Sequence, residues 1–128
     1  MIHTDLRSEP VNHKRRGDAF LNQGRLAEAA ACYKQAIAST PNDADAFINL
    51  GFISLEQNCY VEAVSYLERA VLINPQGADA FYMLGLIYEK KRMTADALKA
   101  WKDFLNVSQD KTKRDVAEKH IHHLSLND

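Results

Sequence analysis

The sequence repeats itself every 34 residues, and this period constrains the fold more than any other feature. Three columns of residues share the interval: a glycine, an alanine, and a large side chain that follows the alanine. The members are Gly17, Gly51 and Gly85, then Ala29, Ala63 and Ala97, then Tyr33, Leu67 and Trp101, with Pro41 and Pro75 closing the first two units. Several independent columns with one period indicate three copies of one supersecondary unit, stacked along the chain.

Each unit has the spacing of two helices separated by a short break. In the second unit, apolar and small side chains recur at helical intervals from Phe47 to Ser54, and a polar break follows at residues 57–59. Gly24 holds the matching place in the first unit and Arg92 in the third. Glycine there suits the left-handed residue that often ends a helix. We therefore predict an all-α fold of antiparallel helix pairs, with about seven helices.

Two further local expectations concern helix starts and helix crossings. Asn42 or Asp43 can cap the helix that follows Pro41, and Thr94 can cap the second helix of the third unit. The three periodic glycines are expected where paired helices cross, because they have no side chain. The three periodic alanines are expected to supply the small surface that faces them.

The repeated columns resemble the tetratricopeptide repeat family over roughly Pro10 to Lys111. The second unit matches the family pattern best, at Phe47, Leu50, Gly51, Ala63, Leu67, Ala70 and Pro75. The resemblance implies a right-handed superhelical stack. We divide the chain into a polar arm (1–9), three repeats (10–43, 44–77 and 78–111), and a capping helix with a tail (112–128). Residues 111–125 carry an apolar-leaning stripe typical of a closing helix, so we expect a complete small protein.

Composition and motifs favour a non-catalytic protein. The formal charge is −1, so nucleic acid is not expected as the main ligand. No apolar run approaches the roughly 20 residues of a membrane span, and the start lacks a secretion signal. Two cysteines without a CxxC pair fit a reducing compartment, so we predict a cytoplasmic protein. His120 and His123 lie three residues apart but have no evident third ligand, so we predict no metal, no cofactor and no enzyme activity.

The first helix of each unit has a second face that its own helix pair does not need for packing. By the family resemblance, this face lines the concave side of the superhelix and binds another protein. The predicted binding residues are Lys14, Asp18, Leu21, Asp45, Ile48, Asn49, Phe52, Tyr82, Met83, Leu86 and Glu89. An apolar middle with polar flanks favours a peptide or an amphipathic helix as the ligand. The resemblance also implies that Asn49 holds a peptide backbone by its amide.

Other interpretations of this face remain open. Phe52 and Leu86 can instead pack against the neighbouring unit, and residues 1–9 can lie in the groove themselves. The chain can also be a self-assembling scaffold, a homo-oligomer through its groove or its ends, or an accessory subunit of an enzyme complex. A role for the convex face, with Glu62 and Tyr66 among its residues, is equally open.

One ligand class can be compared with the sequence directly. Tetratricopeptide domains that bind the acidic C-terminal tails of chaperones use a two-carboxylate clamp of lysine, asparagine and arginine. Lys14 and Asn49 match that clamp, whereas Asp18, Asp79 and Met83 occupy its other three positions. The two carboxylates would repel the acidic tail and the thioether of Met83 would not bind it, so we do not expect a chaperone tail as the ligand.

Overall fold

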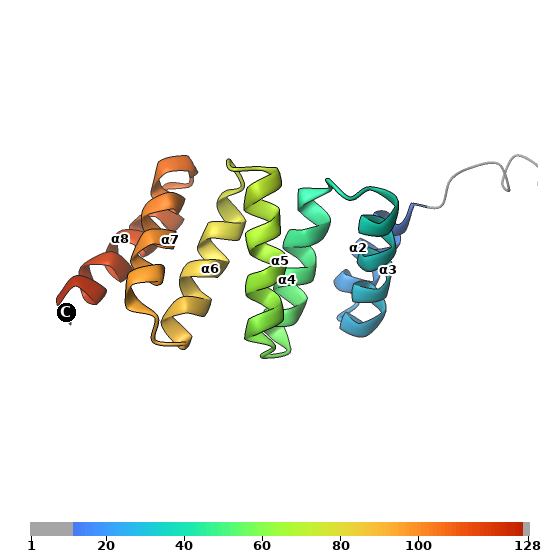
Figure 1. Ribbon diagram of the computed structural model, residues 1–128, viewed down its shortest axis with the longest axis horizontal. Coiled ribbons are helices and arrows are strands. Elements are labelled where there is room, and N and C mark those ends of the chain that lie inside the picture. Colours follow the sequence, from blue (N-terminus) through green and yellow to red (C-terminus); the bar gives the residue numbers. More distant parts are fainter. Residues whose placement is uncertain (1–11, 127–128) are drawn as a thin grey trace, which may run out of the picture.

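The computed structural model describes residues 12–126, which form seven helices and no strand (Figure 1). The predicted polar arm, residues 1–9, lies outside the described residues. The helices are α2 (His13–Asn22), α3 (Leu26–Ser39), α4 (Ala44–Glu56), α5 (Tyr60–Ile73), α6 (Ala78–Lys90), α7 (Thr94–Val107) and α8 (Lys111–Leu126).

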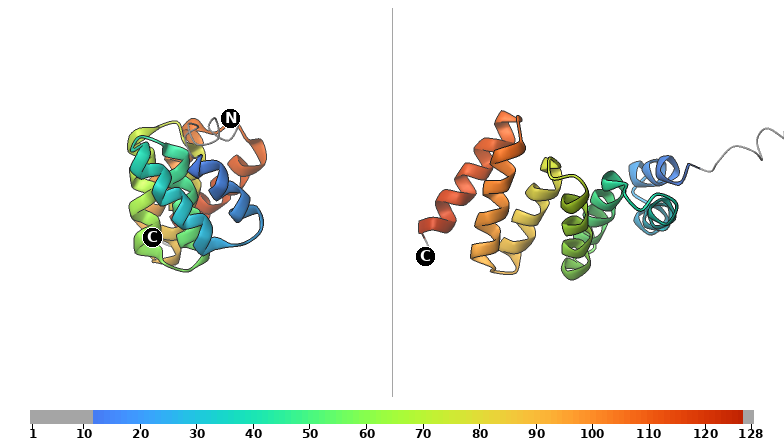
Figure 2. Two further views of the ribbon diagram at one scale, coloured as in Figure 1. Left: turned by 90° about the vertical axis from the view of Figure 1, so that its right-hand side faces the viewer. Right: turned by 45° about the horizontal axis from the view of Figure 1, so that its top comes forward.

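The helices form antiparallel pairs that stack along one axis. α2 pairs with α3, α4 with α5 and α6 with α7, and α8 packs on α7 at the end of the stack. In Figure 1 the second helices α3 and α5 lie in front of their partners α2 and α4, and α6 lies between α5 and α7. Successive pairs are rotated relative to one another, so the stack is twisted (Figure 2). This is the right-handed superhelical stack of helix pairs that the family resemblance implies.

The turn inside each pair is the same motif in all three copies. Gly24, Asn58 and Arg92 have φ values of +74°, +60° and +59°, the left-handed conformation that ends many helices. The next amide in each turn donates to a carbonyl five residues earlier. These bonds join Arg25 to Phe20 (2.9 Å), Cys59 to Ser54 (2.8 Å) and Met93 to Tyr88 (2.8 Å). The prediction for Gly24 is therefore confirmed, and the 34-residue period places this turn three times.

The expectations for helix starts have mixed outcomes. Asp43 caps α4, where its carboxylate accepts a hydrogen bond of 3.2 Å from the amide of Ala46. The prediction for Thr94 is wrong, because Thr94 is already the first residue of α7. Met93 precedes it at the cap position and contributes no side-chain hydrogen bond. The turn motif shortens the connection between α6 and α7. Thr94 therefore stands one position beyond the cap position of α7.

The periodic glycines lie where the helices of a pair approach each other, as expected. Their nearest neighbours on the paired helix are the large side chains of the third periodic column. A Cβ atom on Gly51 would lie 2.6 Å from Cγ of Leu67, and one on Gly85 would lie 2.6 Å from Cε2 of Trp101. Gly17 meets the Tyr33 ring in the same way, at 2.8 Å. The glycine therefore makes room for a bulky residue that fills the space between the two helices of a pair.

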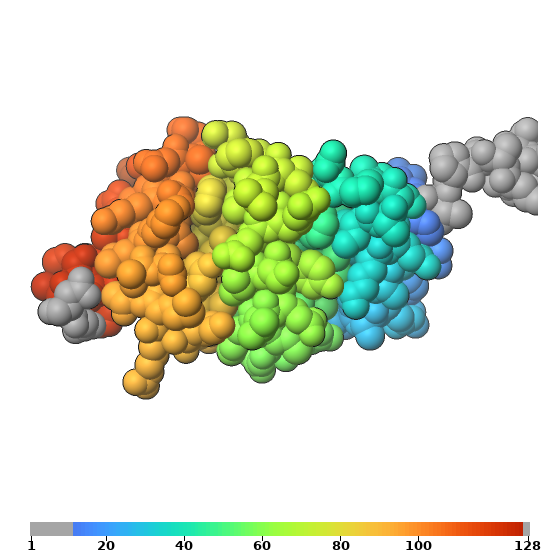
Figure 3. Space-filling view, viewed as in Figure 1, coloured from blue at the N-terminus to red at the C-terminus, as the bar shows by residue number. Residues whose placement is uncertain are grey.

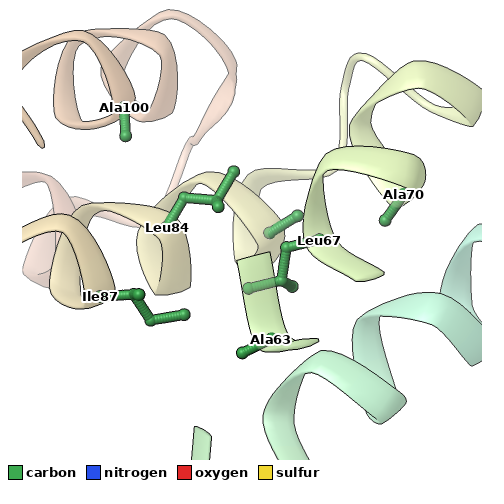
Figure 4. Packing of buried hydrophobic residues seen from close by; sticks show 7 residues of the cluster. Ala63, Leu67, Ala70, Leu84, Ile87 and Ala100 are labelled. Atoms are coloured by element: carbon green, nitrogen blue, oxygen red, sulfur yellow. The ribbon is translucent and has the colours of Figure 1, made fainter. Parts of the chain in front are cut away.

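The core runs through the stack as three clusters, one at each junction. In the central cluster, Leu67 of α5 meets Leu84 and Ile87 of α6, and Ala100 of α7 points toward Leu84 (Figure 4). Each of these side chains is at most 4% exposed, so every helix pair buries its apolar face against the next pair. The stack therefore holds the exposed faces of α2, α4 and α6 in a fixed relation.

Candidate functional site: the face of the first helices

All eleven predicted binding residues lie on the first helices α2, α4 and α6. The polar flanks differ in exposure: Asp18, Asp45 and Asp79 are exposed, whereas Lys14 and Glu89 are partly buried. The apolar residues of the middle are all partly buried. The surface is therefore a set of half-covered apolar side chains with charged groups around it.

Packing between neighbouring pairs accounts for part of this burial. Leu21 and Phe52 pack on the core cluster between the first two pairs. Ile48 and Met83 pack on the cluster between the second and third pairs. Leu86 packs on the last cluster, with Tyr82, α7 and α8. The apolar strip therefore has a structural role, and only its outer surface is available to a ligand.

Lys14 links the first two pairs across this face. Its ammonium lies 3.1 Å from the Asp43 carboxylate and 3.3 Å from that of Asp45. Burial by itself lowers the pKa of Lys14, but the hydrogen bonds and charges of Asp43 and Asp45 outweigh it, so the pKa is raised. Lys14 is therefore charged and already engaged at neutral pH.

Asp18 and Glu89 also have partners within the chain. The hydroxyl of buried Tyr33 donates to Asp18, and burial followed by the Asp18 charge raises the pKa of Tyr33. The Trp101 indole donates to Glu89 at 2.6 Å, and Nδ1 of His120 lies 2.6 Å from the same carboxylate oxygen. These two acids therefore hold helices together as well as facing solvent.

Asn49 is the exception among the polar residues of this face. It lies in α4, the central first helix, and it is partly buried. Its side-chain amide makes no hydrogen bond among residues 12–126 and is accessible at the surface. The amide can therefore donate and accept hydrogen bonds with a ligand without breaking any bond inside the chain.

The sequence did not identify the contribution of α8 to this face. Nζ of Lys113 lies 5.7 Å from the centre of the Tyr82 ring and 3.7 Å from the carboxylate of Asp79. His120 stacks on Trp101 with ring centroids 4.6 Å apart. Lys113 stands 34 residues after Asp79, so the period itself could have indicated that α8 continues the series of first helices.

Groups for other chemistry are sparse in residues 12–126. No three His, Cys, Asp or Glu side chains there are arranged to hold a metal ion. Cys32 is buried and Cys59 exposed, and both are free thiols. In this same part of the chain, no helix has the length and apolar character needed to cross a membrane.

The helix pairs and their shared face define an α-helical repeat domain. A family model described as TPR repeat matches residues 17–58, and another, described as Tetratricopeptide repeat, matches residues 55–103. The chain belongs to the tetratricopeptide repeat family. A comparison with curated proteins finds no match.

Solved structures with this fold include several tetratricopeptide domains. The first such domain of Spaghetti (RPAP3), bound to the HSP90 peptide SRMEEVD, has a TM-score of 0.80 and 19% identity, covering 90% of this chain and 89% of that one. The Arabidopsis OM64 domain has a TM-score of 0.78 and 23% identity, covering 88% and 90%. The second domain of human RPAP3, in complex with the HSP70 peptide SGPTIEEVD, has a TM-score of 0.77 and 22% identity, covering 89% and 92%.

At these identities the likeness shows the fold alone. Two of the three domains nevertheless bind chaperone peptides. Our exclusion of chaperone tails, made from Asp18, Asp79 and Met83, therefore has no support from the comparisons.

Proposed function

We propose that this chain is a non-catalytic protein-interaction module that binds a peptide or an amphipathic helix of another protein across α2, α4 and α6. The observation that carries the proposal is the unpaired amide of Asn49. It lies between Ile48 and Phe52 along the central first helix, where a ligand backbone could reach both the amide and apolar surface. Backbone hydrogen bonds and shallow apolar contacts are the usual means of peptide recognition.

The paired charges of this face limit how it can bind. Lys14 is held by two aspartates, and Glu89 by Trp101 and His120. A ligand that used these groups would have to replace existing contacts. We therefore infer that apolar anchors on Ile48, Phe52 and Met83, together with the Asn49 amide, supply most of the affinity. That related domains bind peptides supports this kind of activity.

Neither matching family model describes an enzyme, which supports a non-catalytic role. The cytoplasmic location remains a prediction from the cysteines.

The test compares the wild type with Asn49→Ala and with Ser65→Ala as a matched control. Ser65 is exposed on α5, the second helix of its pair. A protein captured from lysate by the wild type is identified and shortened to its binding peptide, and affinities are measured by calorimetry. Loss of the amide hydrogen bonds should weaken binding by about 1–2 kcal/mol, roughly 5- to 30-fold. Ser65→Ala should bind like the wild type.

Each alternative has its own outcome in this experiment. Equal affinity of wild type and Asn49→Ala would place the binding site elsewhere. Capture of the chain by itself, with a mass that rises with concentration in sedimentation equilibrium, would favour the self-assembling scaffold. Capture of an enzyme would favour the accessory subunit. The peptide SRMEEVD is titrated in parallel, and binding that Asn49→Ala weakens would place chaperone tails among the ligands.

A further inference from the structure

The opposite layer of the stack contains a hollow between α5 and α7. Its volume is about 220 Å³, well above the ~30 Å³ that one water molecule occupies in the liquid. In Figure 3 it appears as a recess between the orange α7 and the yellow-green end of α5, with yellow atoms of α6 at the bottom. The apolar lining residues are Val71, Phe81, Leu84 and Ala100.

The junction one unit earlier is lined differently. There Tyr66 stands where Ala100 stands here, and its side chain lines two separate recesses, of about 40 Å³ and about 420 Å³. The Tyr66 ring packs there against Phe47, with centroids 6.3 Å apart. With alanine at position 100, Phe81, the counterpart of Phe47, lines a single hollow together with residues of α5 and α7.

The rim of the hollow is acidic. Glu68 and Asp96 are exposed on opposite sides, and neither forms an ion pair within residues 12–126. Asp103 is paired with Lys99 at 2.9 Å. One unit earlier, Lys34 stands in the place of Glu68. Of these two junctions, only the one between the second and third pairs therefore has an acidic rim.

One rim carboxylate is also oriented by the protein. The Tyr88 hydroxyl donates a hydrogen bond of 3.1 Å to Oε2 of Glu68, which leaves the other carboxylate oxygen without a partner. Burial, followed by the charge of Glu68, raises the pKa of Tyr88 to about 12, so Tyr88 remains a donor at neutral pH. The hollow thus combines an apolar floor with an acidic rim, in which Glu68 is held by a hydrogen bond.

We propose that this hollow binds an arginine side chain of a partner protein, independently of the face formed by the first helices. The aliphatic carbons of the arginine would lie on Val71 and Ala100, and its guanidinium would reach Glu68 and Asp96. Arginine fits better than lysine because its planar head stacks on aromatic rings such as Phe81 and binds carboxylates through two parallel hydrogen bonds. A second site of this kind would let one chain hold two segments at once.

The probe is the capped tripeptide Gly-Arg-Gly, titrated to millimolar concentration and followed by amide chemical shifts in NMR. The control peptide carries citrulline, which has nearly the same shape and no charge. We expect saturable shifts at Val71, Leu84 and Ala100, with the citrulline peptide binding about five- to tenfold more weakly because it lacks the charge. No saturable shift, or equal binding of both peptides, would overturn the proposal.

Three variants locate the site. Ala100→Tyr reproduces the side chain of the preceding unit and should abolish the shifts by filling the hollow. The double variant Glu68→Gln, Asp96→Asn alters only exposed side chains and should reduce binding to the level of the citrulline peptide. Glu62→Gln removes the acid equivalent to Asp96 one unit earlier and should change nothing. Persistence of the shifts in the double variant would refute the assignment even if Ala100→Tyr did not fold.

Discussion

Replacement of Gly85 by alanine should destabilise this protein, although alanine is the better helix former. The added Cβ would lie 2.6 Å from Cε2 of Trp101 and 2.7 Å from Cδ2, whereas ordinary contacts begin near 3.4 Å. The Trp101 ring is fully buried, and its indole nitrogen donates to Glu89. His120 stacks on one face at 4.6 Å and Tyr82 meets it edge-on at 5.1 Å. The ring therefore cannot move without losing these contacts.

The expected loss follows from two opposing terms. In an open helix, glycine to alanine gains about 1 kcal/mol from helix propensity. Overpacking a rigid core costs typically about 1–3 kcal/mol, and a clash of this depth with a fixed ring belongs at the upper end. The net prediction for Gly85→Ala is a loss of about 2 kcal/mol in the free energy of unfolding, measured by urea titration with far-ultraviolet circular dichroism.

A reverse substitution supplies the matched control. Ala31 is exposed in the middle of α3, so Ala31→Gly should lose about 1 kcal/mol through propensity alone. If Gly85→Ala gains as much stability as Ala31→Gly loses, the steric reasoning is refuted. Gly85 would then follow the family pattern without a close approach of α6 to the Trp101 ring.

Three further predictions concern single residues. Arg92 is exposed with φ +59°, so Arg92→Gly should relieve backbone strain and raise the free energy of unfolding by about 0.5–1 kcal/mol, seen as a higher urea midpoint; a lower midpoint would contradict this. Asp43→Ala removes both the cap on Ala46 and the pair with Lys14, so thermal unfolding should show a loss of about 1–2 kcal/mol; an unchanged melting temperature would contradict it. The raised pKa of Tyr88 means that the folded state keeps a proton which the unfolded chain loses near pH 10. Stability should therefore be full below pH 10 and fall as the pH rises toward 12, which tyrosinate absorbance and unfolding curves at each pH would show.

The local structure could be predicted well because its causes are local. The turns at Gly24, Asn58 and Arg92 depend on hydrogen bonds between residues five or fewer positions apart. The capping by Asp43 spans three residues. Such signals are present in any short stretch of the chain, and the 34-residue period then repeats them. The wrong prediction that Thr94 caps α7 also has a local cause, because a shift of one position in a turn decides which residue caps the helix.

The candidate binding face was predicted less completely. Its residues could be assigned to the first helices from periodicity, but their contacts could not. Lys14 meets Asp45 across 31 positions, and Glu89 meets His120 across 31. Those distances depend on how the helix pairs rotate along the stack. The sequence therefore indicated which residues share the face, and the structure showed that Asn49 has no hydrogen-bonding partner among residues 12–126.

By itself, the sequence determined the repeat, the helix pairs and the turns within them, because propensity, capping and apolar spacing act between near neighbours. Only the tertiary structure decided that Gly85 faces Trp101, that Lys113 of α8 reaches Asp79 of α6, and that Ala100 and Phe81 line one hollow. These outcomes depend on the volumes of side chains brought together from different helices. Packing of that kind is settled by three-dimensional fit, which no single segment of the chain encodes.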